Sequence, residues 1–180
     1  METLSPVRMA PRWPSTCVTV DDRAYHALQC AAAMLPDGVQ LILTRGYEPK
    51  RSRLGRLRIL FRSGGILAFK ILFPHRRNEI GPIFGANGHD IDGTHIDVSI
   101  EENGKRLRFL PLGVFTPIRV QGILYNKHAK IVDSVRAALI ASGFLIHPNH
   151  TESFQIHCDF IGHPEPDCDR SHASTAAAHL

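Results

Sequence analysis

Long apolar runs are missing from this chain, and their absence limits what the protein can be. No stretch of 18 consecutive apolar residues occurs among the 180 residues, so the sequence predicts no membrane-spanning helix. The first 20 residues lack an apolar secretory core and contain three prolines, which argues against a signal peptide. We therefore expect a protein without a membrane partner.

Cysteine is scarce, and its spacing is irregular. The four cysteines form no C-x-x-C pair; they are Cys17, Cys30, Cys158 and Cys168. This spacing argues against a disulfide scaffold and favours a reducing cytoplasm as the location. One alternative is a binding module in which a structural zinc is held by Cys158, His163, Cys168 and His172, although that spacing matches no common zinc finger.

Acidic residues are nearly absent from residues 45–77, which hold ten Lys or Arg and one acid, Glu48. A local positive field attracts anions, although a solvated helix face is the simpler explanation of such a run. Few aromatic side chains accompany the charge, so we do not expect nucleic-acid binding. We expect a small anionic substrate whose carboxylate is bound by Arg45 or Arg51. Peptide termini, 2-oxo acids and phosphates all meet this requirement.

The spacing of apolar residues predicts one α+β domain over residues 19–162, after an irregular lead over 1–18 and before a disordered tail over 163–180. Helices are expected at 21–35, with Thr19 or Asp21 as the cap, at 51–62, and at 127–142, the last capped by Asn126 and ended by Gly143. Strands are expected at 39–44, 66–73, 94–100, 105–110 and 153–161. Asn103-Gly104 is a strong hairpin signal. We predict a mainly antiparallel sheet with helices packed on one face, because the apolar side chains of the strands must be buried against another element.

Two of the expected strands combine an apolar row with a polar row that contains histidine and aspartate. His95 and Asp97 are two residues apart, as are His157 and Asp159, so each pair projects from one face. If the strands are neighbours, two imidazoles and one carboxylate converge. That set leaves positions open for water or substrate, which suits catalytic zinc or non-haem iron. The alternative is that these side chains only face solvent on half-buried strands.

His89 is a further candidate ligand. It lies in the glycine-rich loop just before the first of these strands. From such a loop a side chain can reach a site at the beginning of the strand. Asp90 and Asp92 share that loop, where aspartate is also common for reasons of turn chemistry alone.

The order of motifs resembles the VanX-type zinc D-alanyl-D-alanine dipeptidases and the wider group of hedgehog-fold DD-peptidases. The segments that carry the resemblance are Gly46-Tyr47-Glu48-Pro49, the stretch GHDIDGTHID over 88–97, Gly113 to Pro117, Gly143-Phe144, and Glu152 to His157. The resemblance implies an α+β fold, a zinc ion bound by histidine, aspartate and histidine, and a glutamate general base. It selects Asp97 and His157 as ligands.

The chain departs from the family pattern at several motif positions. When Gly93 and Asp97 are aligned with the family motif, its first histidine falls on Asp90, with His89 beside it. The family glutamate falls on Phe154, so the nearest candidate for the general base is Glu152. The resemblance thus implies a zinc hydrolase acting on a small peptide or amide with a free carboxylate. For the third ligand, the loop position in the family favours His89, whereas the strand geometry favours His95.

An Fe(II)/2-oxoglutarate oxygenase is the main alternative, because His95-x-Asp97 followed by His157 also resembles the facial triad of those enzymes. They need a basic residue after the second histidine, for which Arg170 is the candidate. Their jelly roll is all-β, whereas a helix is expected here between the ligands. A non-catalytic relative of the peptidase fold is a further possibility.

Overall fold

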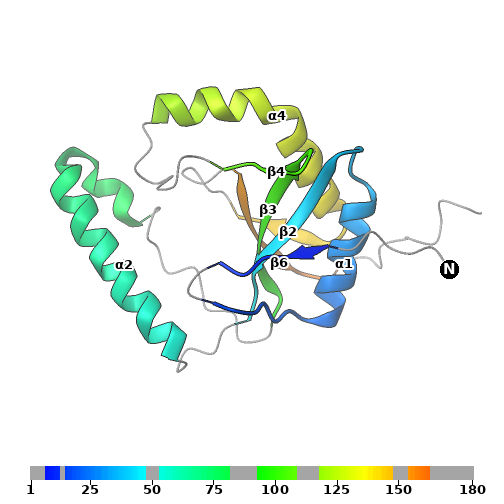
Figure 1. Ribbon diagram of the computed structural model, residues 1–180, viewed down its shortest axis with the longest axis horizontal. Coiled ribbons are helices and arrows are strands. Elements are labelled where there is room, and N and C mark those ends of the chain that lie inside the picture. Colours follow the sequence, from blue (N-terminus) through cyan, green and yellow to red (C-terminus); the bar gives the residue numbers. More distant parts are fainter. Residues whose placement is uncertain are drawn as a thin grey trace, which may run out of the picture.

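The computed structural model describes residues 7–12, 15–47, 53–81, 93–108, 118–147 and 154–162 (Figure 1). Its strands are β1 (Arg8–Met9), β2 (Val39–Arg45), β3 (His95–Glu102), β4 (Lys105–Arg106), β5 (Phe144–Ile146) and β6 (Gln155–Phe160); its helices are α1 (Asp22–Ala33), α2 (Arg53–Leu72) and α4 (Ile118–Ala141), with a 3-10 helix η1 (Pro74–Glu79). The fold is α+β with a mostly antiparallel sheet, as the sequence predicts.

The sheet has the order β1-β2-β3-β6-β5, and β4 pairs with β3. The pairing of β1 with β2 is parallel, and the pairings of β3 with β2, β4 and β6 and of β5 with β6 are antiparallel. β3 therefore lies between β2 and β6, and the two strands with polar rows are direct neighbours. This adjacency is the condition on which the predicted convergence of His95, Asp97 and His157 depends.

Helices α1 and α4 cover one face of the sheet. Their small and aliphatic residues form one core with the apolar rows of β2, β3 and β6: Ala27, Leu28, Ala31, Val132, Val135 and Leu139 against Leu41, Leu43, Ile96, Val98, Ile100 and Ile156. Burial of this apolar surface is the main favourable term in folding. Figure 1 shows α2 on the side of the sheet opposite α1. The polar rows of β3 and β6 occupy that second face, because side chains alternate along a strand.

Several local predictions are confirmed. Asp21 caps α1, and its carboxylate accepts hydrogen bonds from the backbone N–H groups of Arg23 and Ala24. Asn103 and Gly104 have positive φ angles of 50° and 76° in the turn between β3 and β4. Gly143 ends α4 with a φ of 85°. These features depend on near neighbours in the chain, so the sequence reveals them directly.

The prediction of a helix over 51–62 followed by a strand over 66–73 is wrong. A single helix, α2, runs from Arg53 to Leu72 through Ser63-Gly64-Gly65. An apolar run of this length fits a buried strand and a helix equally well, and glycine costs a helix only about 1 kcal/mol relative to alanine. Phe69 and Phe73, four residues apart, bring their rings within 5.2 Å, and the Arg76 guanidinium lies over both.

Gly64→Ala is expected to raise the free energy of unfolding by roughly 0.5–1 kcal/mol, because alanine stabilises a helix interior and an added Cβ meets no atom within 4 Å. Gly104→Ala is the matched control, since its Cβ is equally uncrowded but its φ is positive, so that variant loses stability. Urea unfolding measures both. A loss of stability in Gly64→Ala would contradict the continuous helix.

Three further elements differ from the sequence predictions. Helix α4 begins at Ile118, so Asn126 lies inside it rather than at its cap. The return strand of the hairpin is Lys105–Arg106 rather than 105–110, of which 109–110 lie outside the described residues. Strands β1 and β5 are edge strands of two and three residues that were not predicted. Such short strands carry too little periodicity to be recognised.

Two findings concern the cysteines and the membrane. Cys30 takes part in a disulfide bond, which the irregular spacing of the cysteines did not predict. The cytoplasmic location inferred from that spacing stays a prediction. Among the described helices, none combines the length and apolar character needed to cross a lipid bilayer.

Candidate metal site

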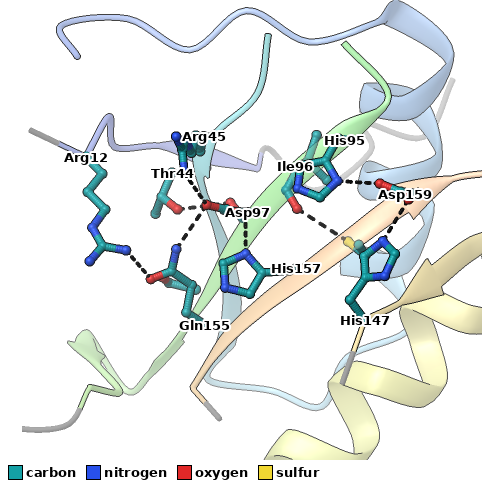
Figure 2. Close-up of polar contacts among 12 residues, drawn as sticks. Arg12, Thr44, Arg45, His95, Ile96, Asp97, His147, Gln155, His157 and Asp159 are labelled. Atoms are coloured by element: carbon teal, nitrogen blue, oxygen red, sulfur yellow. Dashed lines mark hydrogen bonds and ion pairs between the residues drawn. The ribbon is translucent and has the colours of Figure 1, made fainter. Parts of the chain in front are cut away.

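The pairing of β3 with β6 places four polar side chains together on one face of the sheet. His95 lies opposite Asp159, and Asp97 lies opposite His157. Directly paired residues in an antiparallel sheet bring their Cβ atoms within about 5.5 Å. Each histidine therefore has a carboxylate across the strand pair and another two residues away, as Figure 2 shows.

Asp97 is the most buried of the four, with 1% of its side chain exposed. Its Oδ1 is 2.6 Å from Nδ1 of His157, and its Oδ2 accepts a hydrogen bond of 3.1 Å from the side-chain amide of Gln155. The Arg45 guanidinium lies 3.8 Å from the same Oδ2. Thr44 donates its hydroxyl hydrogen to the backbone carbonyl of Asp97 at 3.0 Å. The carboxylate is thus held from β2 and β6 together.

Arg45 reaches this position through an irregularity in β2. The register between β2 and β3 shifts between Leu43 and Arg45, which sets Arg45 opposite Asp97. Such bulges turn a side chain toward a site that a regular strand would not let it reach. About a third of the Arg45 side chain, 36%, is exposed. One cation therefore touches both the buried carboxylate and the solvent.

Asp97 is ionised at neutral pH despite its burial. Loss of solvation raises the pKa of the carboxyl group, but the hydrogen bond from His157 and the electrostatic interactions with His157, Arg45 and His95 outweigh that effect and lower the pKa below its usual value. A buried carboxylate is therefore available as an anionic ligand for a cation.

The side chains of His95, Asp97 and His157 fit the requirements of a transition-metal ion. One ligand atom from each lies within 4.8 Å of the other two. Ligand atoms around a tetrahedral zinc ion are roughly 3.3–3.6 Å apart, since zinc–ligand distances are about 2.0–2.2 Å. For an ion to bind, rotations about the side-chain bonds would have to bring these atoms closer together. Binding through Nδ1 of His157 requires its ring proton to be on Nε2, so that the hydrogen bond to Asp97 is exchanged for coordination.

A second group adjoins the first. Asp159 contacts Nδ1 of His95 through Oδ1, and its Oδ2 is 2.7 Å from Nε2 of His147. One ligand atom from each of these three residues also lies within 4.8 Å of the others. Burial raises the pKa of Asp159, but the hydrogen bonds and electrostatic interactions with the two histidines lower it overall. His147 was not predicted from the sequence; it follows directly after β5, a strand too short to be recognised.

Two of the predicted site residues lie outside the described residues, namely His89 and Glu152. The same holds for Asp90, Asp92, Arg51 and Arg170. Their predicted roles stay predictions. For the alternative structural zinc site, Cys158 lies in the core on the apolar face, and burial raises the pKa of its thiol. A protonated core thiol is a poor metal ligand; the other three residues of that set are not described.

Comparisons of the chain with protein-family models, with curated proteins and with solved structures gave no match. The function of the chain is therefore inferred from the geometry of the polar face and from the motif resemblance.

Proposed function

We propose that this protein is a metal-dependent hydrolase that binds a divalent ion, zinc in our proposal, through His95, Asp97 and His157. The observation that carries the proposal is the convergence of two imidazoles and one ionised carboxylate from neighbouring strands within 4.8 Å. Three protein ligands leave a position for water, as in catalytic rather than structural zinc sites. When bound, the ion lowers the pKa of that water to near neutrality, so that hydroxide becomes available as a nucleophile.

The surrounding residues hold the ligand set in place. Gln155 and Arg45 contact the Asp97 carboxylate, and Arg12 donates a 2.8 Å hydrogen bond to the Gln155 side-chain oxygen (Figure 2). Asp159 contacts His95 and so fixes the orientation of its ring. Outer partners of this kind commonly tune metal affinity by 10- to 100-fold. Glu152 is the proposed general base, in accordance with the motif resemblance.

The substrate class we propose is a small peptide or amide with a free carboxylate. The partly exposed Arg45 guanidinium lies beside the ligand set, where it can bind a substrate carboxylate close to the metal-bound water. The resemblance to D,D-dipeptidases points to the same class. Phosphates and 2-oxo acids share the anionic character and serve as comparison ligands.

Purified protein is expected to hold one or more zinc ions per chain and to hydrolyse dipeptides with a free carboxyl terminus. Plasma emission spectroscopy measures the metal, and release of the free amino acid measures the reaction. Glu152→Gln is expected to keep the metal and lose most of the activity, typically 10²- to 10⁴-fold for a general base. A protein that takes up no metal after reconstitution would refute the proposal.

Arg45→Ala is expected to raise KM for a carboxylate-terminated dipeptide roughly 10- to 100-fold, because a charge-assisted hydrogen bond contributes about 1.5–3 kcal/mol. KM for the amidated dipeptide should change little, since that substrate offers no anion. Arg8→Ala is the matched control, because Arg8 pairs with Glu101 rather than with Asp97 or with a residue that holds Asp97. Equal effects of Arg45→Ala on both substrates would count against a carboxylate-binding role.

Iron is the alternative outcome of the metal analysis, because His95, Asp97 and His157 are also the two-histidine, one-carboxylate set of Fe(II) oxygenases. Helix α4 lies between Asp97 and His157 in the chain, which is unlike the jelly roll of those enzymes. We therefore rank the oxygenase below the hydrolase. Stoichiometric iron together with succinate formation from 2-oxoglutarate would reverse that order.

A further inference from the structure

The group formed by His95, His147 and Asp159 lies on the same polar face as the proposed metal site but includes two residues that this site does not use. Asp159 contacts a different histidine with each of its two oxygens. The rings of His95 and His147 are 5.8 Å apart between centroids. Three potential ligand atoms thus surround one point, within 4.8 Å of one another.

Backbone pairing fixes the positions of the three residues on the sheet. Asp159 pairs with His95 across β3 and β6, and β5 pairs with the other side of β6. The backbone N–H of His147 donates to the carbonyl oxygen of His157 at 2.9 Å, which extends the β5 ladder by one residue. The group is therefore built on the sheet rather than on a loose surface loop, and sites on rigid elements hold their geometry best.

The group is open to solvent, unlike Asp97. The side chains of His95, His147 and Asp159 are 21%, 41% and 34% exposed. An ion could thus enter from water without a large rearrangement and would keep a position for water or a substrate oxygen. Two imidazoles and one carboxylate form a donor set that zinc, nickel and copper all accept.

We propose that His95, His147 and Asp159 bind a second divalent transition-metal ion, and that the His95 ring connects it to the first. The connection rests on the proposed function, because it needs the ion at Asp97 and His157. Nδ1 of His95 faces Asp159, and Figure 2 shows the other ring nitrogen on the side of Asp97. Each nitrogen of one imidazole therefore serves one ion.

The proton balance of this arrangement is simple. A neutral imidazole carries one N–H proton, so the ring must release that proton to solvent when both nitrogens bind metal. The resulting imidazolate carries one negative charge, and together with the carboxylates of Asp97 and Asp159 it offsets three of the four positive charges of the two dications. The hydrogen bonds that Asp159 makes to the two histidines are exchanged for metal bonds.

Zinc binding by single-histidine variants tests the proposal, with ZnCl2 as the probe and equilibrium dialysis of the full chain as the measurement. Wild type should bind two zinc ions per chain, and His147→Ala and His157→Ala should each bind one. The fall in zinc affinity at each site should exceed the roughly 10- to 100-fold decrease that removal of an outer partner causes. His128→Ala is the matched control, because His128 pairs with Glu102 outside both groups, and it should keep two ions.

Copper tests the shared ring. Two Cu²⁺ ions joined by an imidazolate couple their spins, so wild type loaded with CuCl2 should show a weak electron paramagnetic resonance signal. His147→Ala, with one ion, should show the full signal of isolated Cu²⁺. Two bound ions with two full, independent signals would overturn the connection through His95. Circular dichroism checks that each variant folds, and His147→Gln replaces His147→Ala if the latter does not.

The outcomes separate this inference from the proposed function. One zinc in wild type, kept by His147→Ala and lost by His157→Ala, would leave the proposed function intact and refute the second site. One zinc kept by His157→Ala and lost by His147→Ala would refute the proposed site and the shared ring and retain the second group alone. If both variants keep the wild-type zinc, the second group is only a hydrogen-bonded network and the inference is wrong.

Discussion

Asp97→Asn is expected to abolish stoichiometric binding at the proposed metal site, with a fall in zinc affinity of more than 100-fold and a parallel loss of hydrolysis. Asparagine keeps the shape of the side chain, but only its oxygen accepts hydrogen bonds, so in this geometry it keeps the bond from His157 or the bond from Gln155 and not both. It lacks the negative charge, and anionic oxygen is what zinc binds from an acidic side chain. Metal content after dialysis and the rate of dipeptide hydrolysis are the two measurements.

Glu101→Gln is the matched control for this variant. Glu101 lies four residues along β3 on the same face, is also buried, and pairs with Arg8 at 2.8 Å. It belongs to neither candidate ligand group within the described part of the chain. Its replacement should leave zinc content unchanged. Equal metal loss in both variants would mean that the effect comes from disruption of β3 rather than from a missing ligand.

Leu139→Ala is expected to lower the free energy of unfolding by about 2–5 kcal/mol, the cost of removing a fully buried leucine and leaving a cavity. Leu139 lies on α4 in the core shared with α1 and the sheet, and its side chain is fully buried. Because domains of this size are stabilised by only about 5–15 kcal/mol in total, the loss is large. Urea unfolding followed by circular dichroism gives the value.

Ile140→Ala provides the comparison on the same helix. Ile140 is the next residue, is 60% exposed, and should change stability by no more than about 0.5 kcal/mol. Similar shifts in the two variants would contradict the orientation of α4 against the sheet. Zinc binding by Leu139→Ala, measured where the variant is still folded, should resemble wild type, since the helix covers the face opposite the ligands.

The sequence by itself determined the features that depend on near neighbours. Strict alternation over 94–100 and 153–161 revealed which side chains of β3 and β6 share a face, because strand periodicity is a property of the chain itself. The sequence also revealed the Asp21 cap, the Asn103-Gly104 turn and the left-handed conformation of Gly143. The α+β class followed from these elements and from the apolar rows that needed cover.

Only the tertiary structure decided which distant residues meet. The adjacency of β3 and β6 joins residues about sixty positions apart, and no local pattern encodes that pairing. Packing rather than periodicity also produces the bulge that turns Arg45 toward Asp97. The same is true of the short strand β5, which places His147 beside β6. Helix α2 shows the same limit, since an apolar run fits either secondary structure until its neighbours are known. The candidate site therefore combines residues that alternation could mark with contacts that only long-range strand pairing could create.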